Sequence, residues 1–254
     1  MYTRIAVLAL TVCALTGGCS SDTDEPDSST TPSAAAAPAE VKPEVAGTPT
    51  VVWYRSGGET DIDYTNAVAF ELRNPSDQPI QQGRFAIDVL GPDGVMGSSG
   101  PLDVPLAPGE TRLVVSKAVD IEVPGNVYDE AEVKKKAPQG AKVTTYGSPT
   151  GGPAVDPVTT WKSDNLKVTC SGGIAACAVT GDLTWTGELT VGSPRLMAAV
   201  RAKPGGPILA AGEGTTEIAQ FTPGSPQPVE LDIIGLDSPP ANPVIELVAH
   251  LPTT

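Results

Sequence analysis

The residues best suited to chemistry in this sequence are its four cysteines. Cys170 and Cys177 stand close together in the second half of the chain, at a spacing that does not fit a CxxC redox motif. A zinc site is disfavoured as well, because no third or fourth soft ligand is nearby. In an exported protein an even pair of cysteines is oxidised by default, so we expect a disulfide between them.

The amino-terminal residues have the pattern of an export signal. Arg4 is followed by the apolar run 5–15, which is too short to cross a membrane, because a spanning helix needs about 20 apolar residues. Small residues at 16–18 then precede Cys19. A basic, an apolar and a small-residue region in this order are typical of a secretory signal peptide.

The run Leu15-Thr16-Gly17-Gly18-Cys19 resembles the bacterial lipobox, although that family prefers leucine at the position that Thr16 occupies here. The resemblance implies a signal peptide at 1–18, removed before Cys19, and acylation (palmitate) of the Cys19 sulfur. It also implies a lipid-anchored protein on the extracytoplasmic face of the bacterial cell membrane. The alternative is ordinary cleavage, which would leave Cys19 as a free thiol.

Other polar residues offer weaker candidates for a site. His250 is the only histidine, which excludes His-based catalytic triads and multi-histidine metal sites, and we expect it on the surface of the last strand. Glu59, Asp61 and Asp63 could offer oxygens to Ca²⁺, but without a DxDxDG loop we favour solvated acids. We therefore expect no enzyme activity, no metal site and no cofactor.

Composition narrows the class of protein further. The chain has 16 basic and 30 acidic residues, which gives a net charge of −14. Polyphosphate would repel such a chain, so we expect no nucleic-acid partner. The 27 glycines and 26 prolines interrupt any long helical period, which excludes a helical bundle.

Apolar periodicity then divides the chain into elements. Residues 19–48 are rich in Ser, Thr, Ala and Pro, with Val41 and Val45 as the branched apolar residues, so we expect a disordered tether. Beyond it, apolar residues alternate with period two over short runs bounded by Gly, Pro and Asp, which predicts strands. The predicted strands lie at 51–55, 68–73, 85–90, 113–115, 119–121, 142–146, 166–170, 177–183 and 244–250. Acids followed by lysines predict one short helix at about 127–136.

The strand pattern of the first half returns in the second. Residues 68–72 align with 179–183, 85–89 with 196–200, and 113–115 with 229–231, with turns in the same order. About seven short strands in each half favour a β-sandwich. We therefore expect an all-β fold of two tandem immunoglobulin-like β-sandwich modules, at 49–148 and 149–254.

The run Val68–Asn74, the long strand from Arg84 to Leu90 and the turn Leu106–Glu110 resemble FxLYD-type immunoglobulin-like modules of bacterial surface lipoproteins. The resemblance covers residues 65–121 well. It is weaker over 177–236, where Trp185 stands in place of the Asn and the equivalent turn lacks the Glu. It implies the fold and the compartment, but no activity.

Two functions of different classes follow. The first is a non-enzymatic, membrane-anchored lipoprotein that presents two modules for contacts with proteins or cell-envelope polymers. The alternative is a carrier of a small molecule or ion with its site between the modules. An aromatic-lined pocket between the modules would favour the carrier, whereas a small dry junction would favour the first function.

Overall fold

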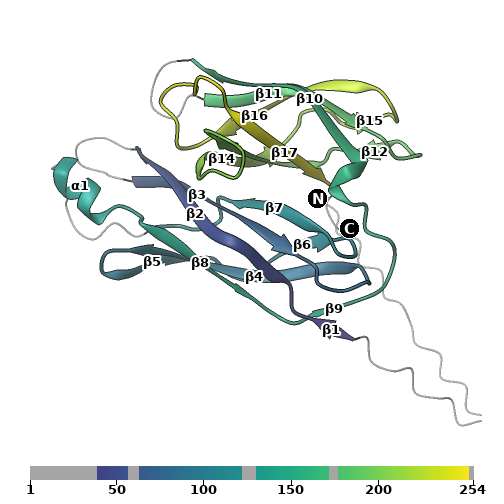
Figure 1. Cartoon of the computed structure of the whole chain (residues 1–254), viewed down its shortest axis with the longest axis horizontal. Helices are drawn as coiled ribbons and strands as arrows, with labels where there is room; N and C mark the ends of the chain where they lie inside the picture. The colour runs from purple at the N-terminus through teal and green to yellow at the C-terminus, as the bar shows by residue number, and fades with distance from the viewer. Residues whose placement is uncertain (1–38, 57–62, 122–129, 172–176, 252–254) are drawn as a thin grey trace, which may run out of the picture. The chain divides into compact units, whose positions relative to one another are not determined.

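A computed structural model of the chain describes residues 39–56, 63–121, 130–171 and 177–251 (Figure 1). The first half (residues 39–149) contains the strands β1 (Glu40–Val41), β2 (Glu44–Ser56), β3 (Asp63–Arg73), β4 (Ile80–Gly91), β5 (Gly94–Ser98), β6 (Leu102–Leu106) and β7 (Thr111–Ser116), the helix α1 (Glu130–Lys136), and the strands β8 (Gly140–Thr145) and β9 (Ser148–Pro149).

A connecting segment (residues 150–157) leads to the second half (residues 158–251). This half contains the 3₁₀ turn η1 (Val158–Thr160) and the strands β10 (Trp161–Cys170), β11 (Cys177–Trp185), β12 (Val191–Gly192), β13 (Arg195–Arg201), β14 (Ile208–Thr215), β15 (Gln220–Phe221), β16 (Pro226–Ile233) and β17 (Val244–His250). The fold is all-β and of the sandwich type, as the strand pattern predicts.

The central strands of the two halves pair in a similar way, although the second sheet has four strands in the first half and three in the second. In the first, β3 lies between β2 and β7, while β4 pairs with β5, β6 and β8. In the second, β11 lies between β10 and β16, while β13 lies between β14 and β17. All these pairs are antiparallel, and each ladder joins strands of one half. The repeat in the sequence is thus a repeat in strand pairing.

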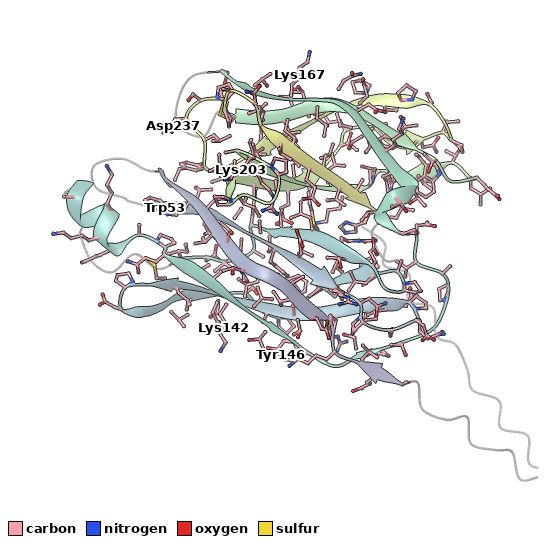
Figure 2. The ribbon with its side chains drawn as sticks, viewed as in Figure 1. Trp53, Lys142, Tyr146, Lys167, Lys203 and Asp237 are labelled. Atoms are coloured by element: carbon pink, nitrogen blue, oxygen red, sulfur yellow. A yellow bond between two sulfur atoms is a disulfide. The ribbon has the colours of Figure 1, made fainter. Side chains whose placement is uncertain are left out.

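Each half encloses aromatic residues between its sheets. Phe70 on β3 meets Phe85 on β4 edge to face, with ring centroids 5.2 Å apart. In the second half Trp161 packs on Trp185 and Phe221, with centroids 4.8 and 5.2 Å apart. Figure 2 shows side chains filling the space between the sheets. Trp161 thus belongs to the core of the second half.

The strand β13 is buried on both of its faces. Leu196, Ala198 and Val200 belong to the core of the second half, whereas Met197 and Ala199 belong to the core cluster of the first. Alternate side chains of a strand point to opposite faces, so one strand serves both cores. In Figure 1 the sheet β2–β3–β7 accordingly lies between the sheet built on β4 and the strands β14 and β17.

The expected end of the tether at residue 48 is too late. Glu40–Val41 pairs with β9, and β2 begins at Glu44. Val41 and Val45 pack against the core, and Pro43 is buried. Two valines and a proline at suitable spacing are enough here because a sheet edge is available to receive them. Residues 1–38, which include the predicted signal peptide and Cys19, lie outside the described residues.

The structure confirms some of the other predicted elements and corrects one of them. The helix is confirmed as Glu130–Lys136, while residues 127–129 of the predicted span lie outside the described residues. The last strand is confirmed at Val244–His250. Val119 and Ile121 are buried as their pattern predicts, but they do not form a strand.

Candidate functional site

The predicted disulfide is confirmed. Cys170 ends β10 and Cys177 begins β11, and the antiparallel register places the two opposite each other. Their Cα atoms lie 4.0 Å apart and the sulfurs are bonded. The bond closes a hairpin at the edge of the second half and leaves no free thiol there, so its part is structural.

The other residues singled out in the sequence do not gather into a site. Glu59 and Asp61 lie outside the described residues, and Asp63 begins β3. Within the described ranges no group of three or more His, Cys, Asp or Glu side chains could hold a metal ion. Within the same ranges no helix is long and apolar enough to cross a membrane.

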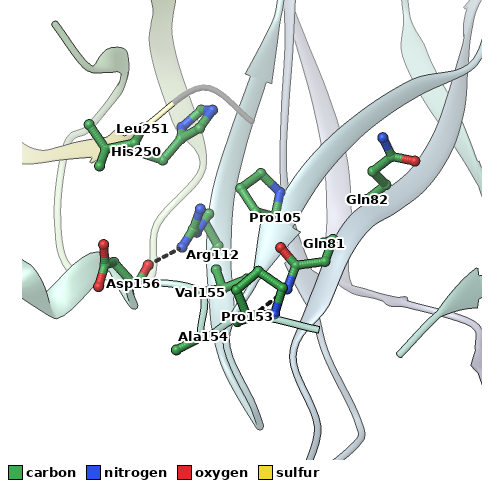
Figure 3. A pocket seen from close by; sticks show the side chains of 10 residues that line it. All are labelled: Gln81, Gln82, Pro105, Arg112, Pro153, Ala154, Val155, Asp156, His250 and Leu251. Carbon is green, nitrogen blue, oxygen red and sulfur yellow. Dashed lines mark hydrogen bonds between the residues drawn. The ribbon is translucent and has the colours of Figure 1, made fainter. Parts of the chain in front are cut away.

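A pocket that the sequence does not reveal lies where the first half, the connecting segment and the end of β17 meet (Figure 3). Its volume is about 450 Å³, within the usual range for small-molecule sites. The apolar part of its wall consists of Pro105, Pro153, Val155 and Leu251, among others. Its polar groups include Arg112 from β7 and His250 from β17.

Arg112 is held by an acid that the preceding turn positions. Gly109 has a φ of 67°, and the amide of Glu110 closes the turn by donating to the carbonyl of Ala107 (3.2 Å). The Glu110 carboxylate accepts hydrogen bonds from the backbone amides of Ala107 (2.7 Å) and Val158 (2.8 Å). It also accepts from Nε (3.2 Å) and Nη2 (3.0 Å) of Arg112. One carboxylate thus joins turn, strand and second half.

The guanidinium of Arg112 is almost completely buried, with 1% of the side chain exposed. Nη2 donates to the backbone carbonyl of Asp156 (3.1 Å), but Nη1 is buried and has no hydrogen-bond partner in the described structure. Burial lowers the pKa of Arg112, and the attraction of Glu110 opposes this effect. A buried cation with an unused donor is costly unless something accepts from it.

His250 is buried, with 8% of its surface exposed, so the prediction of a surface residue is wrong. It lies on the last strand as expected, opposite Arg195 of β13. Burial lowers the pKa of His250 to about 4, and the positive charges of Arg112 and Arg195 add to this effect. The imidazole is therefore neutral at pH 7, and Figure 3 shows it beside the guanidinium end of Arg112.

Gln81 fixes the wall of the pocket that lies opposite the second half. Its Nε2 donates to the backbone carbonyls of Gly151 (3.3 Å) and Pro153 (2.6 Å). These bonds tie the connecting segment to β4, so the prolines that line the pocket have fixed positions. Neither Gln81 nor Arg112 stands out in the sequence. The one available signal for Arg112 is the Pro-Gly-Glu turn two residues before it.

The arrangement can bind a hydrogen-bond acceptor against an apolar wall. Comparison with models of protein families gives no match to this chain, and a search of curated proteins gives none either. The resemblance to FxLYD-type modules therefore stays a prediction.

Proposed function

We propose that this chain is a lipoprotein anchored through Cys19 to the extracytoplasmic face of a bacterial cell membrane. Its two β-sandwich halves would act without catalysis, by presenting surfaces to proteins or cell-envelope polymers. The observation that carries this proposal is the apolar run 5–15 followed by Leu15-Thr16-Gly17-Gly18-Cys19. An acyl-modified cysteine with more than one chain gives stable membrane attachment.

Two features of the folded part support the proposal. The disulfide Cys170–Cys177 suits an oxidising compartment such as the outside of a cell membrane. The first described strand begins at Glu40, so a stretch of chain separates Cys19 from the folded halves. That stretch would hold the halves away from the membrane surface.

The test is the variant Cys19→Ala, expressed beside the wild type and the control Cys13→Ala. Cys13 lies in the part of the chain that is removed, so its loss should change nothing. We expect wild type and Cys13→Ala in the membrane fraction with the mass of an acylated chain. Cys19→Ala should be released or remain unprocessed. A Cys19→Ala protein that stays in the membrane fraction with the wild-type mass would overturn the proposal.

A second candidate, the carrier, is favoured by the pocket beside Arg112. Met197, Ala199 and Val248 of the second half share a core with the first half, and this packed part of the junction supports the presenting function. The pocket lies at one end of that junction, and its wall is aliphatic and polar rather than aromatic. A carrier with this site would take a small ligand that carries an acceptor group.

A further inference from the structure

The comparison of the two halves shows that an ion pair such as Glu110–Arg112 is not needed to build this corner of the sheet. Arg112 lies opposite Leu72 on β3, and Gln227 lies opposite Leu183 at the equivalent place on β11. The second half thus makes the same corner without an ion pair. A buried ion pair that is no better for stability than a neutral residue calls for another explanation.

The unused donor of Arg112 is the first part of that explanation. Nη1 is buried, has no partner, and belongs to a side chain that lines the pocket. Within the described residues the imidazole of His250 makes no hydrogen bond, and it lines the same pocket. A neutral imidazole has one N–H to donate, so the two residues together offer two donors. Two donors that line one pocket match the two oxygens of a carboxylate.

The electrostatics of the pocket also favour a negative group. The charged residues around His250 are Arg112 with Glu110, Asp156 of the connecting segment, and Arg195 with Glu213. Of these charged residues, Arg112 and Arg195 lower the pKa of His250, in addition to the larger effect of burial. Asp156 is exposed, and water screens its charge. A field that repels a proton attracts an anion.

From these contacts we infer that the pocket binds a small carboxylate with a compact aliphatic body. One carboxylate oxygen would accept from Nη1 of Arg112 and the other from the imidazole of His250. The aliphatic part would lie against Pro105, Val155 and Leu251. This inference rests on the carrier function proposed above and adds its ligand class.

The single histidine makes the test direct, because an untagged chain gives one imidazole signal. The full-length chain, purified in mild detergent, is titrated with butyrate and with its neutral isostere butyramide, and the ¹³Cε1–H signal of His250 is followed by NMR. Butyrate should shift the signal and move the midpoint of the His250 titration to higher pH, because a bound anion favours the imidazolium. By linkage, the butyrate anion should bind more tightly as the pH falls from 7 to 5, with the affinity counted per ionised butyrate because the carboxyl group itself begins to take up protons in this range.

A matched pair of variants locates the binding. Ala154 is exposed on the pocket wall, and Ala241 is exposed in the turn before β17, at the other end of that strand. Ala154→Trp should abolish the effect of butyrate by filling the pocket, while Ala241→Trp should leave it unchanged. Butyrate should bind about tenfold more tightly than butyramide, as expected for a charge-assisted hydrogen bond.

The possible outcomes distinguish a failure of the carboxylate inference from a failure of the carrier function. If butyramide acts as strongly as butyrate and Ala154→Trp blocks both, the pocket remains a ligand site and the carboxylate inference is overturned. If neither compound moves the His250 signal, or if Ala154→Trp binds butyrate like the wild type, the pocket is not the site and the carrier function fails with it. Anchoring through Cys19 is tested separately and is unaffected by either result.

Discussion

The two halves of the molecule solve the same corner with different side chains. Asn74 follows β3, and its Nδ2 donates to the carbonyl of Gln78 (2.8 Å). Trp185 ends β11 at the equivalent place, and its Nε1 donates to the carbonyl of Leu189 (2.7 Å). The corner therefore needs a buried N–H donor and not an asparagine. In the second half the same residue also adds an aromatic ring to the core.

The next turn shows the opposite relation, with the same backbone and different chemistry. The amide of Glu110 donates to the carbonyl of Ala107, and the amide of Ser225 donates to that of Thr222, each at 3.2 Å. Only the first turn carries the acid that binds Arg112. What the halves share is thus required by the fold, and what differs is free to serve a site.

The largest expected effect comes from breaking the ion pair of the first half. Arg112→Gln introduces the residue of the second half but leaves the Glu110 carboxylate, 6% exposed, without its cation. We expect a loss of about 3 kcal/mol in the free energy of unfolding, measured with urea. The double variant Glu110→Ser/Arg112→Gln removes both charges and should lose less than the single one. A double variant that is as unstable as the sum of both single changes would show that the charges are not coupled.

The disulfide is the second difference between the halves, because the equivalent pair in the first half is Trp53 and Asn66. Replacing Cys170 and Cys177 by Ala should cost about 2.5 kcal/mol, as the closed loop is short. Hydrogen exchange should rise in β10 and β11 and stay almost unchanged in β3 and β4. Equal loss of protection in both halves would mean that they unfold as one unit.

The third difference is His250, whose counterpart Tyr146 on the edge of the first half is 43% exposed. The pKa of His250 is lower in the folded chain, about 4, than the ordinary 6.5 of the unfolded chain. The unfolded chain therefore takes up the proton first, so stability is complete above pH 6.5 and falls as the pH drops toward 4. Between pH 6.5 and 5 the loss attributable to this residue should be roughly 2 kcal/mol.

The control for that titration is His250→Gln, which should not show this part of the pH dependence in urea unfolding. The pKa of Glu246 is raised by burial and by Glu71, so it acts in the opposite direction, and it is common to both proteins. Tyr146→His in the His250→Gln background should titrate near 6.5, since that position is open to water. Wild type and His250→Gln with the same pH dependence would contradict the buried neutral imidazole.

The smallest effect concerns the bulges of the two edge strands. β2 has Gly47 at a φ of 75° where its register to β3 shifts, and β10 has Asn165 at a φ of 56° where its register to β11 shifts. Asn165→Ala should cost about 1 kcal/mol, because alanine disfavours the left-handed region. Asn165→Gly should be nearly neutral, losing only the exposed hydrogen bond to Asp182. Thermal unfolding distinguishes the two, and equal stability of both variants would contradict the role of backbone conformation.

Much of the fold could be predicted from the sequence because it depends on local patterns. The alternation of apolar residues predicted the central strands, and the ordered repetition of strands and turns predicted that the two halves are equivalent. The sequence did not predict the strand residues at 40–48. Val41 and Val45 are packed because β9 and the core residues that contact them come from distant parts of the chain. Pairing between distant segments leaves no mark in a short window.

The pocket could not be predicted for a related reason. Arg112 stands between Thr111 and Leu113, where alternation gives no sign that a charged residue turns inward. Its burial depends on Glu110 and on the connecting segment that passes over it. His250 is buried because the face of β17 that bears it meets the first half. Both are consequences of how the halves pack, which a period-two pattern does not encode.

The strand buried on both faces has a consequence for how the protein matures. Ala69 and Val115 lie opposite each other on the outer face of the sheet β2–β3–β7, and the Val115 amide donates to the sulfur of Met197 on β13 (3.3 Å). A chain that is synthesised amino end first delivers this sheet well before β13. Until then its apolar outer face meets water or a chaperone. A product truncated after β9 would therefore be expected to aggregate rather than persist as a soluble half.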